Sequence, residues 1–311
     1  MKPLNNKEIF GNWATLLLPI NKDESINYNK LADEIDFLIS CKVNGIYSNG
    51  TAGEFYNQTE DEFDKVNLLL AEKCNAAKMP FQIGCAHMSP QISLERLKRA
   101  VELKPSAIQV ILPDWFPPTI QESIVFLGRM AELADPVGLV LYNPPHSKKK
   151  LTPEEFYQIM EAGIPLVGCK VAGGDENWYR QMKNLVPQLS LFIPGHYLAT
   201  GIKSGAHGAY SNVACLHPKA AQDWYDLMST NMDQAFEIEQ RILYFMNTYI
   251  QPFIKEKGYS NQAVDKLLAA IGGWADIGTR LRWPYQWIGE GEVEKVRPAC
   301  RSILPEFFFN D

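Results

Sequence analysis

The feature that most constrains the fold of this chain is an alternation, repeated eight times, of a short apolar run, a turn and a longer amphipathic stretch. Each short run is apolar throughout and does not alternate with polar residues, which is typical of parallel strands buried on both faces. The runs cover residues 13–18, 45–48, 80–85, 107–112, 138–142, 166–170, 189–193 and 208–211. We therefore predict strands at these eight places and helices between them.

The stretches between the runs carry the signals of helices. Leu31, Ile35 and Leu38 recur at three- and four-residue spacing, which places them on one helix face that can pack on the strands. Ser89 followed by Pro90 indicates a helix start. Three other stretches begin with a capping box, a Thr followed three residues later by a Glu, whose side chains satisfy the free N–H groups of a first helical turn. The pairs are Thr59 and Glu62, Thr119 and Glu122, and Thr152 and Glu155.

Strand–helix units in this number favour a closed parallel barrel or a doubly wound sheet. The barrel is favoured because no glycine-rich dinucleotide fingerprint follows the first strand. After the last strand the pattern is helical only, at residues 233–254, 261–271 and 291–303, and Trp283-Pro284 stands in the last linker. We predict an α/β fold in which residues 1–225 form a (β/α)8 TIM barrel. Residues 226–311 are predicted to form a C-terminal helical extension packed on it.

Charge and cysteine usage narrow the class of protein. The net charge of −6 and the pI near 5.5 argue against a nucleic-acid partner, which would require a clustered basic face. The lysine run at residues 148–150 is interpreted as a solvated loop. Six cysteines form no CxxC pair and mostly stand in apolar surroundings, as reduced core cysteines do. We expect a cytoplasmic protein without a signal peptide, a membrane span or a membrane partner.

In a parallel barrel the reactive residues sit at the C-terminal ends of the strands, and Lys170 ends the sixth predicted strand. An ammonium among Leu, Val, Gly and Cys loses hydration, which lowers its pKa and leaves more free amine. A free amine in a dry pocket attacks ketones to give an imine. From the local sequence alone, Lys170 can also extend into water or pair with a buried carboxylate such as Glu54.

Two other strand ends carry candidate site residues. Tyr142 ends the fifth predicted strand, where its phenol can relay a proton to and from a substrate oxygen, or be an ordinary tyrosine of the barrel rim. The turn of residues 50–53 after the second strand offers consecutive backbone N–H groups and the Thr51 hydroxyl, which together can hold a carboxylate.

Taken together, these segments resemble the dihydrodipicolinate synthase and N-acetylneuraminate lyase family of class I aldolases. That family is marked by a G-[ST]-[ST]-G-E turn, a Tyr-Asn-x-Pro strand end and a G-x-K segment with the Schiff-base lysine. The order and spacing match, and the likeness runs from about Trp13 through the C-terminal helices. The segments read Gly50-Thr51-Ala52-Gly53-Glu54, Tyr142-Asn143-Pro144-Pro145 and Gly168-Cys169-Lys170.

The resemblance implies a barrel with a helical tail that binds pyruvate or a similar 2-keto acid and uses no metal and no organic cofactor. It also implies a homo-oligomer, a dimer or a tetramer. It makes Lys170 the imine former, Tyr142 the proton relay, and Thr51 both a relay and a carboxylate contact. The candidate substrate contacts are Gly50, Thr51, Ala52 and Tyr210.

The chain departs from the family pattern at several positions. Ala52 stands where the family has a second hydroxyl, which removes one hydrogen bond to a carboxylate, of order 1 kcal/mol. Ser147 stands where the synthases carry the arginine that binds the second substrate, and Lys148 offers a point charge but no bidentate fork. Trp115 replaces a tyrosine that the synthases send across a subunit interface. His196 stands where the sialic acid lyases have acidic residues.

These departures indicate that the first half of the family reaction is kept and that the second substrate differs. Phe55, Trp115, His196 and Tyr210 are predicted to form an aromatic pocket for it, with ordinary core packing as the alternative for each.

Several functions therefore stay open. The leading hypothesis is a Schiff-base lyase, aldolase or dehydratase that acts on pyruvate or a 2-keto-3-deoxy acid through Lys170. The alternatives are dihydrodipicolinate synthase proper, a catalytically silent barrel that binds a keto acid, and a metal-dependent lyase. The metal-dependent lyase would use His87, His146 or His196, but no HxH or HxxxH spacing supports it.

Overall fold

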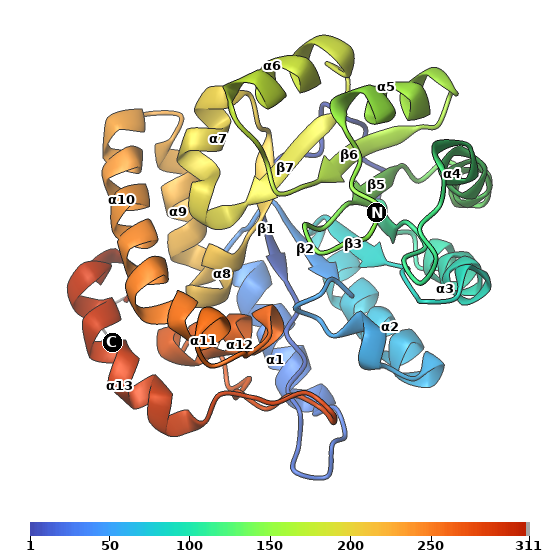
Figure 1. Cartoon of the computed structure of the whole chain (residues 1–311). Coiled ribbons are helices and arrows are strands. Elements are labelled where there is room, and N and C mark those ends of the chain that lie inside the picture. The colour runs from blue at the N-terminus through green and yellow to red at the C-terminus, as the bar shows by residue number, and fades with distance from the viewer. Residues whose placement is uncertain (309–311) are drawn as a thin grey trace.

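The computed structural model describes residues 1–308 and contains a closed barrel of eight parallel strands, each paired with its neighbours in chain order (Figure 1). The predicted fold class is confirmed. The strands are β1 (Gly11–Thr15), β2 (Gly45–Ser48), β3 (Phe81–Gly84), β4 (Ala107–Ile111), β5 (Leu139–Tyr142), β6 (Leu166–Lys170), β7 (Ser190–Pro194) and β8 (Gly208–Tyr210).

The largest difference from the predicted strand bounds is at β1, which spans Gly11–Thr15 and not residues 13–18. The strand begins with Gly11 and Asn12, so a search for apolar runs does not detect its start. Its end is earlier because the Leu17 N–H donates a hydrogen bond to the buried Glu34 carboxylate, 2.7 Å away, and not to a neighbouring strand. Leu17 stays fully buried, so its apolar character reflects the core and not a strand.

Helices follow the strands and cover the outside of the barrel, as the ring around the strands in Figure 1 shows. All three predicted capping boxes are confirmed, with both reciprocal hydrogen bonds present in each. The helix predicted at Ser89 and Pro90 begins at Pro90, but the Ser89 side chain caps no N–H group. These helices are α1 (Tyr28–Ser40), α2 (Glu60–Ala77), α3 (Pro90–Glu102), α4 (Ile120–Ala134), α5 (Pro153–Glu161), α6 (Glu176–Leu185), α7 (Leu198–Ser204) and α8 (Asn212–Leu216), with the short 3-10 turns η1 (Phe55–Asn57) and η2 (Gly195–Tyr197).

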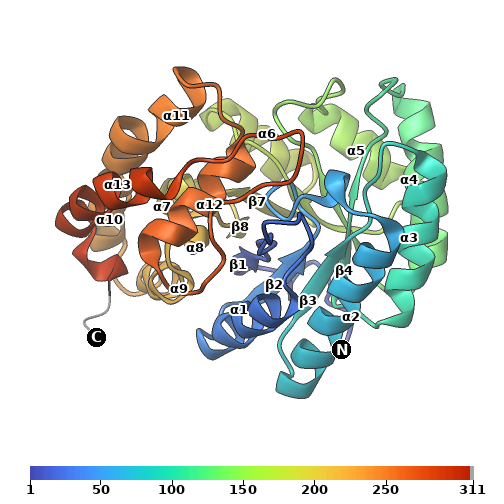
Figure 2. The same ribbon diagram turned by 90° about the horizontal axis from the view of Figure 1, so that it is seen from below.

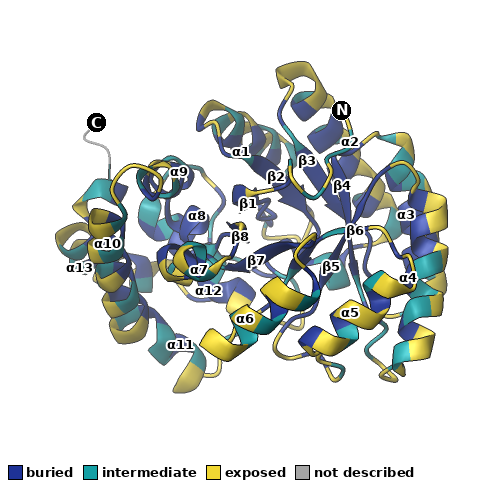
Figure 3. Ribbon diagram, turned by 90° about the horizontal axis from the view of Figure 1, so that it is seen from above, coloured by how far each residue is buried: buried dark blue, intermediate teal, exposed yellow. Residues whose placement is uncertain are grey.

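The buried residues fall into two groups. The larger one fills the space between the strands and the helices, and Figure 3 shows buried strands inside helices whose outer faces are exposed. The smaller one fills the inside of the barrel with residues of six strands and of the segment before β1. It consists of Ile9, Trp13, Tyr47, Ala107, Val140, Phe192 and Tyr210. All six cysteines are buried and free, as their apolar surroundings predict.

The chain after β8 is helical, as predicted, and gathers on one side of the barrel (Figure 2). The predicted helix at residues 233–254 is interrupted by a π-helical turn, η3 (Met246–Ile250), which separates two α-helices. Trp283-Pro284 is a cis peptide in the last linker. The remaining elements are α9 (Pro218–Leu227), α10 (Met232–Phe245), α11 (Gln251–Lys255), α12 (Asn261–Gly272), α13 (Glu290–Ile303) and the 3-10 turn η4 (Pro305–Phe307).

The division of the chain into residues 1–225 and 226–311 stays a prediction, and its boundary falls within α9. Residues 309–311 of the predicted extension lie outside the described residues. Within residues 1–308, no helix has the length and apolar character that a membrane crossing requires.

Candidate active site

Lys170 closes β6 and directs its amine into the mouth of the barrel among aromatic rings. The Nζ atom lies 4.2 Å from the centre of the Tyr142 ring, 5.2 Å from that of Tyr47 and 5.5 Å from that of Tyr210. The inner core of the barrel, to which two of these tyrosines belong, lies below the amine. The Lys170 amine is therefore enclosed by apolar side chains on its inner side and can be reached only from the mouth of the barrel.

This burial changes the acid–base behaviour of the lysine. Loss of hydration lowers the pKa of Lys170 from its ordinary 10.5 to about 8, and the nearby Asp265 carboxyl partly opposes this shift. A larger fraction of the side chain is then the free amine at neutral pH. Glu54, the buried carboxylate considered as a partner of Lys170, is instead paired with Lys266, 2.6 Å away.

Tyr142 stands beside Lys170 because the two residues are paired in the register of β5 and β6. Its hydroxyl lies 3.5 Å from the Thr51 hydroxyl, and either group can be the donor. Burial raises the pKa of the Tyr142 phenol, and the hydrogen bond to Thr51 partly offsets it. The phenol therefore keeps its proton at neutral pH and can pass it along a two-hydroxyl chain.

The turn after β2 brings Thr51 and Ala52 to the cavity. Gly50 precedes them and packs on an aromatic ring, where a Cβ would come within 2.7 Å of a Tyr47 ring carbon. Glu54 ends the turn in the left-handed region, with φ near 51°. A glycine is thus needed at position 50 so that the turn can lie against the floor of the site.

A buried ion pair between α12 and Glu54 holds this turn in position. Lys266 of α12 donates to Glu54 Oε1 and to the Arg280 carbonyl oxygen, each over 2.6 Å, and both side chains of the ion pair are fully buried. The C-terminal helices are in this way connected directly to the turn that carries Thr51.

The asparagine of the Tyr-Asn-x-Pro segment forms hydrogen bonds that shape the loop after β5. The Asn143 amide group donates to the Lys149 carbonyl over 2.8 Å, and its oxygen accepts from the Leu151 N–H over 2.8 Å. The Asn143 N–H itself bonds to the Lys170 carbonyl over 2.9 Å. The asparagine therefore shapes the loop after β5 and holds it against the end of β6.

The cavity above Lys170 has a volume of about 300 Å³ and is closed on one side by the C-terminal helices. That side is mostly apolar, contributed by Met246, Ile250, Ile254 and Val264, with the polar Gln251, Asn261 and Asp265 among them. Because π-helical turns often occur at functional sites, the position of η3 at this wall fits a substrate-binding role for the tail.

Two functional candidates in this cavity were missed from the sequence, Tyr47 and Asp265. Tyr47 lies inside β2 with no motif around it, and only its inward position in the barrel marks it. Asp265 follows Val264 in α12, where most residues are buried. A charged residue among so many buried ones is the sequence signal that could have indicated a site residue. Burial raises the pKa of Asp265 from 3.8 to about 7, and the positive charge of Lys170 opposes the rise.

The predicted aromatic pocket is only partly correct. His196 and Tyr210 line the cavity, whereas Phe55 and Trp115 do not. Trp115 is 76% exposed, and the Lys148 amine donates to its carbonyl oxygen over 2.8 Å instead of facing the cavity. The His196 Nδ1 atom lies against the side-chain amide of Asn212, 2.9 Å from its nitrogen.

The geometry does not favour a metal centre. Of the three histidines considered as ligands, only His196 lines the cavity. Within residues 1–308, no three side chains of the types His, Cys, Asp and Glu are grouped so that they could hold a metal ion.

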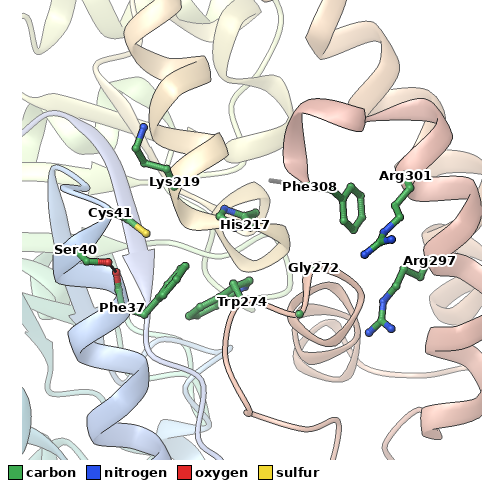
Figure 4. A pocket seen from close by; sticks show the side chains of 11 residues that line it. Phe37, Ser40, Cys41, His217, Lys219, Gly272, Trp274, Arg297, Arg301 and Phe308 are labelled. Carbon is green, nitrogen blue, oxygen red and sulfur yellow. Dashed lines mark hydrogen bonds between the residues drawn. The ribbon is translucent and has the colours of Figure 1, made fainter. Parts of the chain in front are cut away.

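A second and larger cavity, of about 740 Å³, lies outside the barrel between α1, α9 and α13 (Figure 4). Two of the three Lys and Arg side chains that line it already have hydrogen-bond partners within the fold. Arg297 donates to the Ile271 and Ala270 carbonyls at the end of α12, and Lys219 pairs with Asp223. None of the predicted site residues lines this cavity, so the mouth of the barrel is the candidate active site.

The fold and this lysine-centred mouth match a known class of enzymes. A model of the dihydrodipicolinate synthetase family matches residues 9–299, and the chain therefore belongs to that family, whose members are lyases and aldolases. This confirms the resemblance seen in the three sequence segments.

Similar proteins span nearly the whole chain. A 4-hydroxy-tetrahydrodipicolinate synthase of Macrococcus caseolyticus is 26% identical over 263 residues, which cover 81% of this chain and 87% of that one. A trans-O-hydroxybenzylidenepyruvate hydratase-aldolase of Sphingobium xenophagum is 22% identical over 324 residues, covering 97% and 94%. The crystal structure of YagE, a prophage protein of E. coli K12 in complex with pyruvate, superposes with a TM-score of 0.83 at 18% identity and covers 95% and 98%.

Proposed function

We propose that this chain is a class I, Schiff-base-forming lyase that acts on pyruvate or a 2-keto-3-deoxy acid through Lys170. The observation that carries the proposal is the surroundings of the amine. It lies within 5.5 Å of three tyrosine ring centres, has a lowered pKa and has no ion-pair partner among the described residues.

The proposed reaction begins when the Lys170 nitrogen attacks the C2 carbonyl of the keto acid. A C–N bond forms, the oxygen takes up protons and leaves as water, and a positively charged iminium remains. In the cleavage direction, the positive iminium favours loss of the Tyr142 phenol proton, which passes through the Thr51 hydroxyl to solvent. The phenolate then takes the proton of the C4 hydroxyl, the C3–C4 bond breaks and its electrons pass into the iminium. An aldehyde leaves, the resulting enamine takes a proton at C3, and water releases pyruvate and the free amine.

Thr51 and the turn after β2 would bind the keto-acid carboxylate. The backbone N–H groups of Thr51 and Ala52 and the Thr51 hydroxyl provide donors at the edge of the cavity. The Thr51 hydroxyl also lies 3.5 Å from the Tyr142 hydroxyl, so it can return the proton that Tyr142 receives. Gly50 supports this turn, and Tyr210 forms part of the wall beside the amine.

The similar proteins support the same chemistry. The Sphingobium xenophagum relative is a hydratase-aldolase of a substituted pyruvate, and the YagE structure, which shares the fold, contains pyruvate. Dihydrodipicolinate synthase proper is less well supported, since Ser147 replaces the expected arginine and none of the described residues that line the cavity is an arginine.

The test is to incubate the protein with pyruvate and borohydride and to locate the reduced adduct by mass spectrometry. We expect the adduct on Lys170 and on no other lysine, together with retro-aldol turnover of 2-keto-3-deoxy acids. An adduct without turnover of any acid would indicate a barrel that only binds the keto acid. Loss of activity with a chelator, without an adduct, would refute the imine mechanism.

A further inference from the structure

Helix α12 directs two consecutive charged side chains to different places. Lys266 is fixed in the interior by Glu54 and by the Arg280 carbonyl oxygen, each 2.6 Å away. Asp265, one residue earlier and about 100° around the helix, lines the cavity that contains Lys170. Because the buried ion pair prevents the helix from rotating, the Asp265 carboxyl is held in the mouth of the barrel.

The Asp265 carboxyl has no hydrogen-bond donor within residues 1–308, and the only charge that influences it there is Lys170. The titratable groups of the other elements around the cavity are Lys170, Tyr142, Tyr47, His196, Tyr210 and Cys215. Apart from Asp265, none of the described residues that line the cavity carries a carboxylate. The Asp265 carboxyl is partly buried and has no donor among the described residues, so a ligand hydroxyl in the cavity can supply one.

Imine formation would strengthen the negative character of Asp265. The imine accepts the electrons of the breaking bond only while its nitrogen is protonated, so Asp265 faces a positive charge in the reactive intermediate. A fixed positive charge nearby favours the ionised form of a carboxyl. The part of the cavity beyond C3 of the bound keto acid then holds one anion, apolar side chains of the tail and the amides of Gln251 and Asn261.

This inference rests on the function proposed above. We propose that Asp265 determines specificity for the second half of the substrate: it accepts a hydrogen bond from a hydroxyl of an uncharged aldehyde and disfavours aldehydes that carry a carboxylate. A hydroxyl that donates to Asp265 supplies the missing partner, whereas a carboxylate is repelled and finds no arginine in the described lining.

The experiment uses two matched sets of aldehydes with pyruvate. The aromatic set is 2-hydroxybenzaldehyde, benzaldehyde and 2-carboxybenzaldehyde, and the aliphatic set is glycolaldehyde, acetaldehyde and glyoxylate. In at least one set we expect the wild type to prefer the hydroxylated over the carboxylated member in kcat/KM by about 100-fold, the size expected for one charged hydrogen bond gained and one charge repelled. In Asp265→Asn we expect that ratio to fall about tenfold or more.

The matched control is Asp276→Asn, which removes an exposed carboxylate just beyond α12 that pairs with Lys30. We expect it to leave the aldehyde ratios unchanged. Asp265→Asn also removes the negative charge that raises the pKa of Lys170, so the acid limb of the pH profile for borohydride trapping should move to lower pH. A purely structural role would not produce this shift.

The outcomes separate the two proposals. A missing adduct in the wild type refutes the imine mechanism itself. An adduct in Asp265→Asn with unchanged aldehyde ratios refutes the specificity role and leaves the imine mechanism intact. If the variant does not fold, the wild-type panel decides, because a preference for 2-carboxybenzaldehyde or glyoxylate, or no turnover of any of the six aldehydes, overturns the role of Asp265.

Discussion

Two desolvated lysines in this molecule show how the same side chain is used in different ways. Loss of hydration lowers the pKa of both Lys170 and Lys266, but Lys266 is fully buried whereas Lys170 is only partly buried. Lys266 has a carboxylate and a carbonyl oxygen at 2.6 Å, which fix its ammonium group. Lys170 has tyrosine rings around it and a carboxyl that influences it without forming a hydrogen bond.

The difference lies in what completes each environment. The environment of Lys266 is complete within the protein, so this lysine connects α12 to the turn after β2. Lys170 has no ion-pair partner within residues 1–308, which leaves its amine available for the proposed reaction. In this proposal a desolvated lysine is reactive because it lacks a fixed partner more than because it is desolvated.

The largest expected effect, and the sharpest test of this comparison, is that of Lys170→Met. We expect adduct formation to disappear and turnover to fall by more than about 10⁴-fold, the order seen when a covalent nucleophile is removed. The free energy of unfolding should not decrease, since the variant removes a desolvated amine without an ion-pair partner. Trapping by borohydride and denaturant unfolding would measure the two effects.

The same variant gives a pH test with a definite sign. Between pH 8 and 10.5 the unfolded chain keeps the proton of Lys170 and the native state releases it, so the wild-type free energy of unfolding rises with pH. Lys170→Met should lack this contribution. An equal rise in both proteins would mean that Lys170 is not desolvated, and the contrast with Lys266 would fail.

Tyr142→Phe is expected to have the next largest effect. Removing the phenol hydroxyl 3.5 Å from Thr51 should lower kcat about 10²- to 10⁴-fold, the usual share of a general acid–base group. The pyruvate adduct on Lys170 should still form, because the ring that faces the amine is retained. Stopped-flow kinetics of adduct formation beside steady-state turnover would separate the two steps, and equal losses in both would contradict a relay role.

Lys266→Met should act on stability more than on chemistry. It leaves the fully buried Glu54 carboxylate without its partner, which typically costs about 3–5 kcal/mol. The double variant Lys266→Met with Glu54→Gln should regain part of this loss, because no uncompensated charge remains. Urea unfolding of the single and double variants measures the coupling energy between Lys266 and Glu54. A single variant as stable as the wild type would show that this ion pair does not stabilise the packing of the tail on the turn.

The surroundings of these two lysines differ in how much of them could be predicted from the sequence. Lys170, Tyr142 and Thr51 come from strand ends, whose positions follow from the apolar runs, and the structure brings the three together. Asp265 and Lys266 come from the tail, and nothing in the helical pattern tells which part of the barrel the tail covers. Long-range packing of this kind has no local signal.

The incorrect assignments have the same cause. Trp115 follows β4 in the chain, but its loop turns outward, and the ring is 76% exposed instead of lining the cavity. Phe55 follows the turn that carries Thr51, yet it continues into η1 and away from the mouth. A residue type near a strand end predicts the chemistry available there, whereas the direction of a loop depends on contacts with distant segments.

The smallest expected effect is that of Ala52→Ser, which adds a hydroxyl beside Thr51 at the edge of the cavity. If the Lys266–Glu54 pair holds this turn where the carboxylate binds, the new hydroxyl should strengthen pyruvate binding by about 1 kcal/mol, or roughly fivefold. The pyruvate dependence of adduct formation would measure it, with Ala52→Gly as the matched change that adds no donor. In the Lys266→Met background the gain should shrink, because the turn is no longer fixed. A gain of the same size in both backgrounds would show that the two lysines act independently.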